Sequence, residues 1–175
     1  MISITRKITI ILLILCGFNT EAQNQNNEKQ KCNCCDAPYT NFDFWEGDWI
    51  VKNKNGEIVG ENTITKKENN CMLEEKWRGS KGSSGTSINF YNKADDTWNQ
   101  TWVSNSGNFL QLKGKIIGNK MVLKSELIQG KKGKYYNQIS WSPNKDGTVT
   151  QLWEIFTESG KPIQNIFKGI YHRKQ

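Results

Sequence analysis

Turn signals recur at short intervals along the chain, and no long stretch between them has helical periodicity. Clusters of Gly, Asn, Asp, Ser and Pro separate segments of about seven to ten residues in which apolar and polar side chains alternate, a pattern typical of β-strands. Because the connections are short, consecutive strands are expected to be antiparallel neighbours. The expected strands lie at about 47–53, 58–66, 71–78, 85–92, 97–104, 108–116, 119–128, 134–142, 147–156 and 163–173.

A meander of this kind must protect the edges of its sheet. It either packs as a sandwich or closes into a barrel, which removes exposed edges altogether. The chain shows no internal repeat beyond the hairpins and no linker that would divide it into two domains. We predict an all-β fold, a single antiparallel up-and-down β-barrel of about ten strands, in residues 41–175.

Residues 41–49, at the start of the strand pattern, contain four aromatic side chains. Phe44 and Trp45 are adjacent, so this segment cannot alternate cleanly as a strand, but it fits one helical turn. Gly47 then allows a sharp turn of the backbone, and Trp49 begins the first strand. The segment therefore predicts a short turn that closes one end of the barrel.

The FDFWEGDW motif at 42–49, followed by CMLEEKW at 71–77, WNQTW at 98–102 and QLWE at 151–154, resembles a family of bacterial proteins of unknown function. Members are often secreted or periplasmic and carry a calycin-type, lipocalin-like β-barrel. The resemblance covers about residues 40–173. The first motif is fairly specific, and the later ones support it by order and spacing. The resemblance implies a fold and a compartment, but no established activity.

Residues 1–22 have the pattern of a secretory signal peptide. Arg6 and Lys7 precede a short apolar run, and small residues allow cleavage after Ala22. The run is too short to remain as a membrane-spanning helix, so no integral membrane segment is expected after cleavage. We predict export to the periplasm or the medium, with lipid anchoring through Cys16 as the weaker alternative.

A flexible leader at 23–40 is expected to follow the signal. An even number of cysteines in an exported chain favours disulfides. Cys34 and Cys35 are adjacent and are not expected to pair with each other, so we predict a bond from the 32–35 cluster to Cys71. Metal binding and free thiols are weaker alternatives, and no metal or cofactor is assigned. The four cysteines are Cys32, Cys34, Cys35 and Cys71.

The chain is basic, with a formal net charge of +7. Its lysines are scattered, and no arginine-rich stripe with interleaved aromatic residues is present. A solvated basic surface is therefore expected, and a nucleic-acid partner is not. The sequence does not predict an oligomeric state.

Alternation places tryptophans and polar side chains on the same face of several strands. So many tryptophans on a solvent-facing surface would form a large exposed apolar patch, so these faces are predicted to point into the barrel. Gln138 and Tyr136 are expected to join this lining, with Trp141 on the opposite face of their strand. The three inward sets are Leu73, Glu75 and Trp77; Trp98, Gln100 and Trp102; and Val149, Gln151 and Trp153.

These faces predict a barrel that binds a small apolar or amphipathic molecule in its interior. The tryptophans would supply the walls, and the glutamate and glutamines would orient a polar group of the ligand. The expected ligand-binding residues are Trp49, Glu75, Trp77, Trp98, Gln100, Trp102, Gln138, Gln151 and Trp153.

Two other functions stay open, and no catalytic residue is assigned. An enzyme acting on a small lipid or sugar-like molecule could use Glu75 as acid or base, which would require a second polar residue nearby and a strongly raised carboxylate pKa. A barrel with a filled core could instead be an interaction module for a protein partner. His172 is expected to face solvent if Tyr171 faces inward, so haem is not expected.

Overall fold

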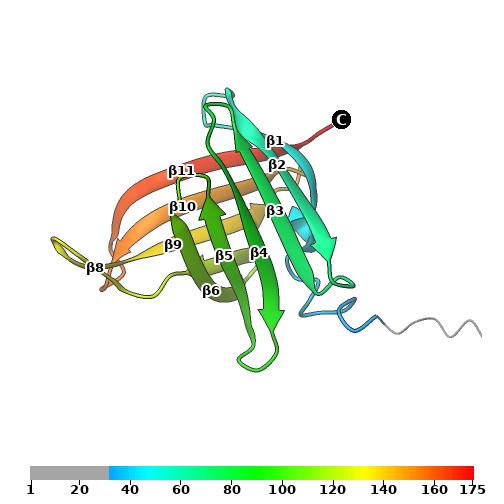
Figure 1. Cartoon of the computed structure of the whole chain (residues 1–175), viewed down its shortest axis with the longest axis horizontal. Coiled ribbons are helices and arrows are strands. Elements are labelled where there is room, and N and C mark those ends of the chain that lie inside the picture. Colours follow the sequence, from blue (N-terminus) through cyan, green and yellow to red (C-terminus); the bar gives the residue numbers. More distant parts are fainter. Residues whose placement is uncertain (1–31) are drawn as a thin grey trace, which may run out of the picture. The chain divides into compact units, whose positions relative to one another are not determined.

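A closed antiparallel β-barrel dominates residues 32–175, the part of the chain that the computed structural model describes (Figure 1). The predicted signal peptide and the first part of the leader lie outside these residues. Adjacent strands pair along the sheet, and β10 pairs with both β9 and β11, which closes the barrel. The elements are η1 (Asp43–Trp45), β1 (Gly47–Lys52), β2 (Ile58–Lys67), β3 (Met72–Gly79), β4 (Ser84–Asn92), β5 (Thr97–Ser104), β6 (Phe109–Ile117), β7 (Lys120–Lys124), β8 (Ile128–Gly130), β9 (Gly133–Pro143), β10 (Val149–Thr157) and β11 (Pro162–Arg173).

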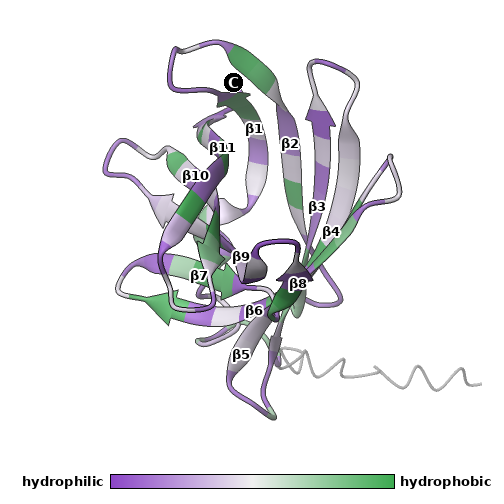
Figure 2. Cartoon of the chain, turned by 90° about the vertical axis from the view of Figure 1, so that its left-hand side faces the viewer, coloured by the Kyte–Doolittle hydropathy of each residue, from purple (hydrophilic) through white to green (hydrophobic). Residues whose placement is uncertain are grey.

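The fold class predicted from the sequence is confirmed. Figure 2 shows hydrophobic and hydrophilic residues alternating as bands along several strands, as a barrel with one buried face requires. Within the described residues, no helix has the length and apolar character needed to cross a membrane.

The expected strand at 119–128 is wrong in its middle. β7 ends at Lys124, and a separate short strand, β8, begins at Ile128; both pair with β9. At the break, the N–H of Ser125 still donates to the carbonyl oxygen of Asn137 at 2.9 Å, but Ser125 Oγ takes the place of a backbone carbonyl as acceptor for the Asn137 N–H, also at 2.9 Å. Beyond this break, β8 and the start of β9 project from the barrel as a hairpin (Figure 1).

The predicted inward faces of β3, β5 and β10 are confirmed, but that of β9 is wrong. Ile139 and Trp141 are buried inside the barrel, where they oppose Trp153 and Gln151 of β10. Gln138 therefore lies on the outer face. Its expected companion Tyr136 is also outside, stacked on Phe156 with ring centroids 5.4 Å apart.

Aromatic side chains seal one end of the barrel. Phe42 and Trp45, in and beside η1, are fully buried and stack with centroids 4.9 Å apart. Trp141 packs edge-on against Phe42 at 5.1 Å, and Trp98 does so at 5.6 Å. The indole N–H of Trp49 donates to the carbonyl oxygen of Trp45 at 2.9 Å. The turn that the aromatic motif predicts is thus a plug for the closed end.

Arg173, at the end of β11, fixes this plug to the barrel wall. Its guanidinium carbon lies 4.1 Å from the ring centroid of Trp49, and its Nη1 donates to the carbonyl oxygen of Glu46 at 2.6 Å. Gly47 has φ +127°, and a Cβ there would collide with this guanidinium. Only glycine fits this backbone conformation and close approach.

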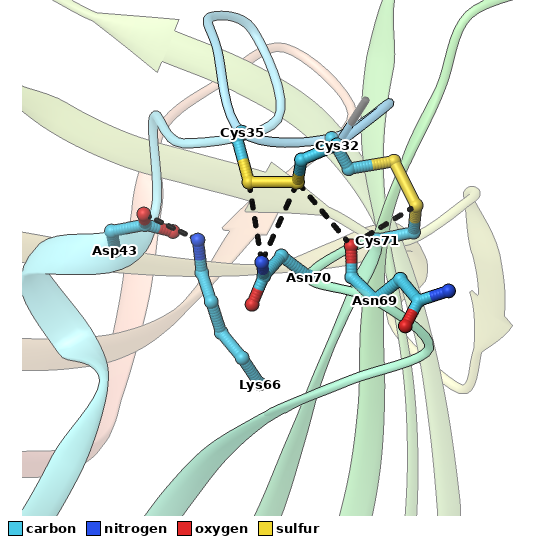
Figure 3. Close-up of a disulfide and its surroundings, with 8 residues drawn as sticks. Cys32, Cys35, Asp43, Lys66, Asn69, Asn70 and Cys71 are labelled. Carbon is cyan, nitrogen blue, oxygen red and sulfur yellow. Dashed lines mark hydrogen bonds and ion pairs between the residues drawn. A yellow bond between two sulfur atoms is a disulfide. The ribbon is translucent and has the colours of Figure 1, made fainter. Parts of the chain in front are cut away.

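Two disulfides lie beside the closed end of the barrel, and one of them attaches the leader to it (Figure 3). Cys34 pairs with Cys71, which confirms the predicted link, and Cys32 pairs with Cys35. The amide nitrogen of Asn70 donates to the sulfur of Cys35 at 3.2 Å.

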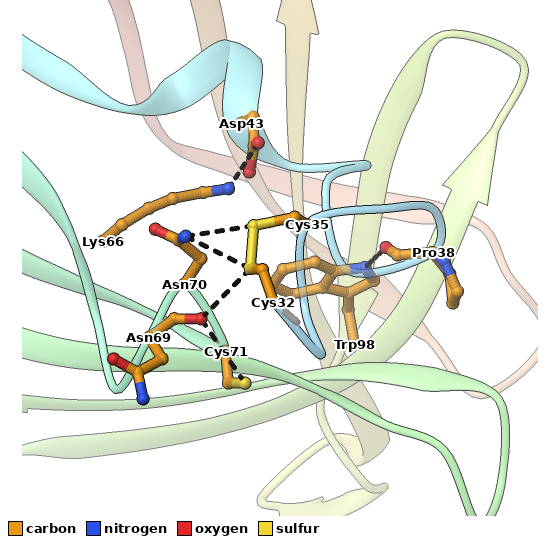
Figure 4. A network of polar contacts seen from close by, with 9 residues as sticks. All are labelled: Cys32, Cys35, Pro38, Asp43, Lys66, Asn69, Asn70, Cys71 and Trp98. Atoms are coloured by element: carbon orange, nitrogen blue, oxygen red, sulfur yellow. Dashed lines mark hydrogen bonds and ion pairs between the residues drawn. A yellow bond between two sulfur atoms is a disulfide. The ribbon is translucent and has the colours of Figure 1, made fainter. Parts of the chain in front are cut away.

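Further polar contacts hold the same region. The indole N–H of Trp98 donates to the carbonyl oxygen of Pro38 at 3.3 Å, and Lys66 forms an ion pair with Asp43 of η1 at 2.5 Å (Figure 4). The leader and η1 are therefore linked to β2, β5 and the turn before β3.

Candidate ligand-binding site

A cavity of about 460 Å³ occupies the half of the barrel away from η1, a volume usual for small-molecule sites. β3 starts beside the disulfides of the closed end, so the turn that follows it lies at the other end. This turn, which contains Lys81, forms part of the cavity mouth. The cavity walls are mainly apolar, and the residues that form them include Val59, Trp77, Trp102, Leu110, Ile139, Trp153, Ile166 and Phe167.

Most of the ligand-binding residues expected from the sequence line this cavity, but three do not. Trp49 and Trp98 belong to the buried aromatic core of the closed end, and Gln138 lies outside the barrel. The residues that meet at the cavity are Glu75, Trp77, Gln100, Trp102, Gln151 and Trp153.

Glycines let the tryptophans lie against the wall and leave the centre open. A Cβ on Gly60 would come within 2.6 Å of the Trp77 ring, and one on Gly85 would collide with the ring of Trp102. Larger residues at these glycines would push the rings away from the wall. The indole nitrogen of Trp153 donates to Asn137 Oδ1 at 2.9 Å, which fixes that ring as well.

The cavity floor begins at a row of hydrogen-bonded polar side chains that ends on a carboxylate. Gln100 Nε2 donates to Asn89 Oδ1 at 2.8 Å. Asn89 Nδ2 donates to Ser87 Oγ at 2.8 Å, and the Ser87 hydroxyl donates to Glu75 Oε2 at 2.7 Å. The inner faces of β3, β4 and β5 thus share one network.

The network continues from the carboxylate to the opposite wall. Asn62 Nδ2 donates to Glu75 Oε1 at 2.7 Å and to the hydroxyl of Tyr171 at 3.3 Å. The Tyr171 hydroxyl donates in turn to Gln151 Oε1. Gln100 and Gln151 are therefore joined to Glu75 through intermediate side chains.

Glu75 is buried, with 6% of its surface exposed. Burial raises its pKa from 4.5 to about 7, although the hydrogen bonds from Asn62 and Ser87 oppose this shift. Burial, together with the charge of Glu75, also raises the pKa of Tyr171 well above its ordinary value. Near neutral pH the floor thus holds a neutral phenol and a carboxyl group close to half ionised.

Sequence reasoning missed Asn62, Ser87 and Asn89, and it did not assign Tyr171 to the site. Tyr171 could have been found, because it shares the inward alternation of β11 with Phe167. The three small polar residues carry no comparable signal, since their types are equally common on solvent-facing positions of strands.

The chain matches no protein-family model and no curated protein. Within residues 32–175, no cluster of three or more His, Cys, Asp or Glu side chains could hold a metal ion.

Proposed function

We propose that this barrel binds a small amphipathic molecule non-covalently in its interior. The observation that carries the proposal is the cavity of about 460 Å³ with tryptophan walls and a polar floor. The apolar part of the ligand would lie against Trp77, Trp102 and Trp153. Its polar group would reach Glu75 and the two glutamines, because a few polar groups at fixed positions orient a ligand in an apolar site.

We also propose that the protein works outside the cytoplasm. Its two disulfides would persist in an oxidising compartment, and the signal-like N-terminus supports export to the periplasm or the medium. A lipid anchor at Cys16 is the secondary possibility. The barrel architecture agrees with the lipocalin-like exported family that the FDFWEGDW motif resembles, and we propose that the chain belongs to it.

Blocking the cavity tests the binding function. We expect Leu110→Trp to weaken binding of the neutral fluorescent probe N-phenylnaphthylamine, because Leu110 lines the cavity and the larger ring would occupy part of it. The matched control is Phe109→Trp at the preceding residue of β6, whose side chain faces outward and is 70% exposed. Fluorescence titration measures both. Equal binding by the two variants would mean that the probe does not occupy the cavity, and would contradict the proposal.

A catalytic role for Glu75 is the second candidate, favoured by its pKa of about 7, which suits a general acid or base. The test is incubation of a bacterial lipid extract with wild-type protein or Glu75→Gln, followed by mass spectrometry. A species converted only by the wild type would support catalysis, whereas an unchanged extract would leave binding as the function.

A further inference from the structure

Among the residues in 32–175 that line the cavity, Glu75 is the only acidic one. Its hydrogen-bond donors are a neutral amide and a neutral hydroxyl. No ion pair within residues 32–175 involves it. Lys81, the one basic lining residue, belongs to the exposed turn at the mouth, whereas Glu75 lies at the floor. The carboxylate at the floor therefore lacks a cationic partner from the described protein.

A buried carboxylate without a counter-charge is unstable relative to two alternatives. It can take up a proton, or it can meet a cation brought by a ligand. The raised pKa of Glu75 favours the first alternative. A cationic ligand would provide the second and would hold the carboxyl group in its ionised form.

The cavity floor has hydrogen-bond acceptor positions that the protein leaves unused and that could receive the donors of an ammonium group. Each oxygen of Glu75 accepts one protein hydrogen bond, although a carboxylate has about four acceptor positions. Gln100 uses its Nε2 to bond Asn89, and its Oε1 accepts no hydrogen bond from residues 32–175. Gln100 is 3% exposed and lines the cavity. An ammonium, with three donors and no acceptor, complements these groups.

We infer that the ligand is a lipophilic amine whose ammonium group pairs with Glu75 at the cavity floor. This inference rests on the proposed binding function and names its ligand class. The apolar part of the amine would fill the space between Trp77, Trp102 and Trp153, whose ring faces also attract cations. An anionic amphiphile, with its head group at Lys81, would instead place its apolar tail against the polar floor, which is the less favourable arrangement.

The pairing makes binding dependent on pH. Tyr171, with its raised pKa, stays neutral across the relevant range, and Lys81 is the only other titratable lining residue. A primary amine stays protonated up to a pH of about 10. Affinity for an amine should therefore rise between pH 5.5 and pH 8 as Glu75 ionises.

The test compares three probes that share one chain: decylamine, decanol and decanoic acid, each displacing N-phenylnaphthylamine from the full mature protein. At pH 8 we expect decylamine to bind about tenfold or more tightly than decanol, as is usual for a charge-assisted contact in a buried site. Glu75→Gln should remove this preference. The matched control, Glu74→Gln, changes the neighbouring residue, which forms an ion pair with Lys76 at 3.1 Å, and should retain it.

Several outcomes would overturn the inference. Equal binding of decylamine and decanol, or a preference that survives Glu75→Gln, would remove Glu75 as the counter-ion while leaving a binding barrel. Tightest binding by decanoic acid, weakened by Lys81→Gln, would assign the head group to the mouth. Failure of every probe, N-phenylnaphthylamine included, would contradict the binding function itself. If Glu75→Gln does not fold, a decylamine preference in the wild type that does not fall from pH 8 to pH 5.5 would overturn the inference.

Discussion

Asn62 is the member of the polar network whose side chain has a buried atom without a hydrogen-bond partner. Its nitrogen serves both Glu75 and Tyr171, while its buried Oδ1 has no hydrogen-bond partner in the described residues. A flipped Asn62 amide would turn this oxygen toward Glu75, which can donate a hydrogen bond only when it is protonated. The same residue can therefore serve both protonation states of the carboxyl group.

The raised pKa of Glu75 predicts how stability changes with pH. Between its unfolded value of 4.5 and its folded value of about 7, the folded protein holds a proton that the unfolded chain has released. This contribution to stability is fully present below pH 4.5 and is lost as the pH rises through 7. Glu75→Gln should remove the dependence and make the protein more stable at pH 8, by about 3 kcal/mol at most.

Urea unfolding at pH 5 and pH 8 measures this effect. Glu74→Gln, on the outer face of the same strand, should leave the difference between the two pH values as it is in the wild type. A Glu75→Gln variant that is less stable than the wild type at pH 8 would show that the network needs the carboxylate. Together with the ligand test, the expected result would mean that Glu75 is kept for binding at the expense of stability.

At the scale of elements, the two disulfides should contribute unequally. Cys34–Cys71 closes a loop with a sequence separation of 37, whereas Cys32–Cys35 has a separation of 3. In the chain-entropy description these loops correspond to about 4 and about 2 kcal/mol. We expect alanine at both Cys34 and Cys71 to lower the free energy of unfolding more than alanine at both Cys32 and Cys35. Urea titration of the two double variants decides this, and equal losses would contradict it.

The boundaries and inward faces of strands were predicted well where the sequence of the strand itself determines them. They were predicted poorly where contacts with distant residues determine them. The run at 119–128 looks like one strand, but its pairing with β9 becomes irregular at Ser125, whose Oγ rather than a backbone carbonyl accepts the N–H of Asn137. Both faces of β9 carry an aromatic residue, so its alternation fits either orientation. Trp141 faces inward because the aromatic cluster of the closed end takes it up, and this contact is invisible in the β9 segment alone.

At the scale of the whole molecule, the barrel divides into a filled half and an open half. The alternation of tryptophans predicts which faces point inward, and those of β3, β5 and β10 do. The alternation does not predict how far along the barrel axis each tryptophan lies. Trp49 and Trp98 were therefore expected at the ligand but belong to the sealed core. Depth depends on how far the η1 plug reaches and on where glycines let indole rings lie against the wall.

The pairing of β1 with β11 also bears on how the protein is made. Arg173 joins the end of β11 to Trp49 and Glu46 at the start of the barrel, so the first and last barrel strands to leave the ribosome are direct neighbours. Contacts between segments so far apart in sequence form late and slowly. A nascent chain cannot close this barrel until β11 has been synthesised, so the closed fold forms only after elongation is nearly complete.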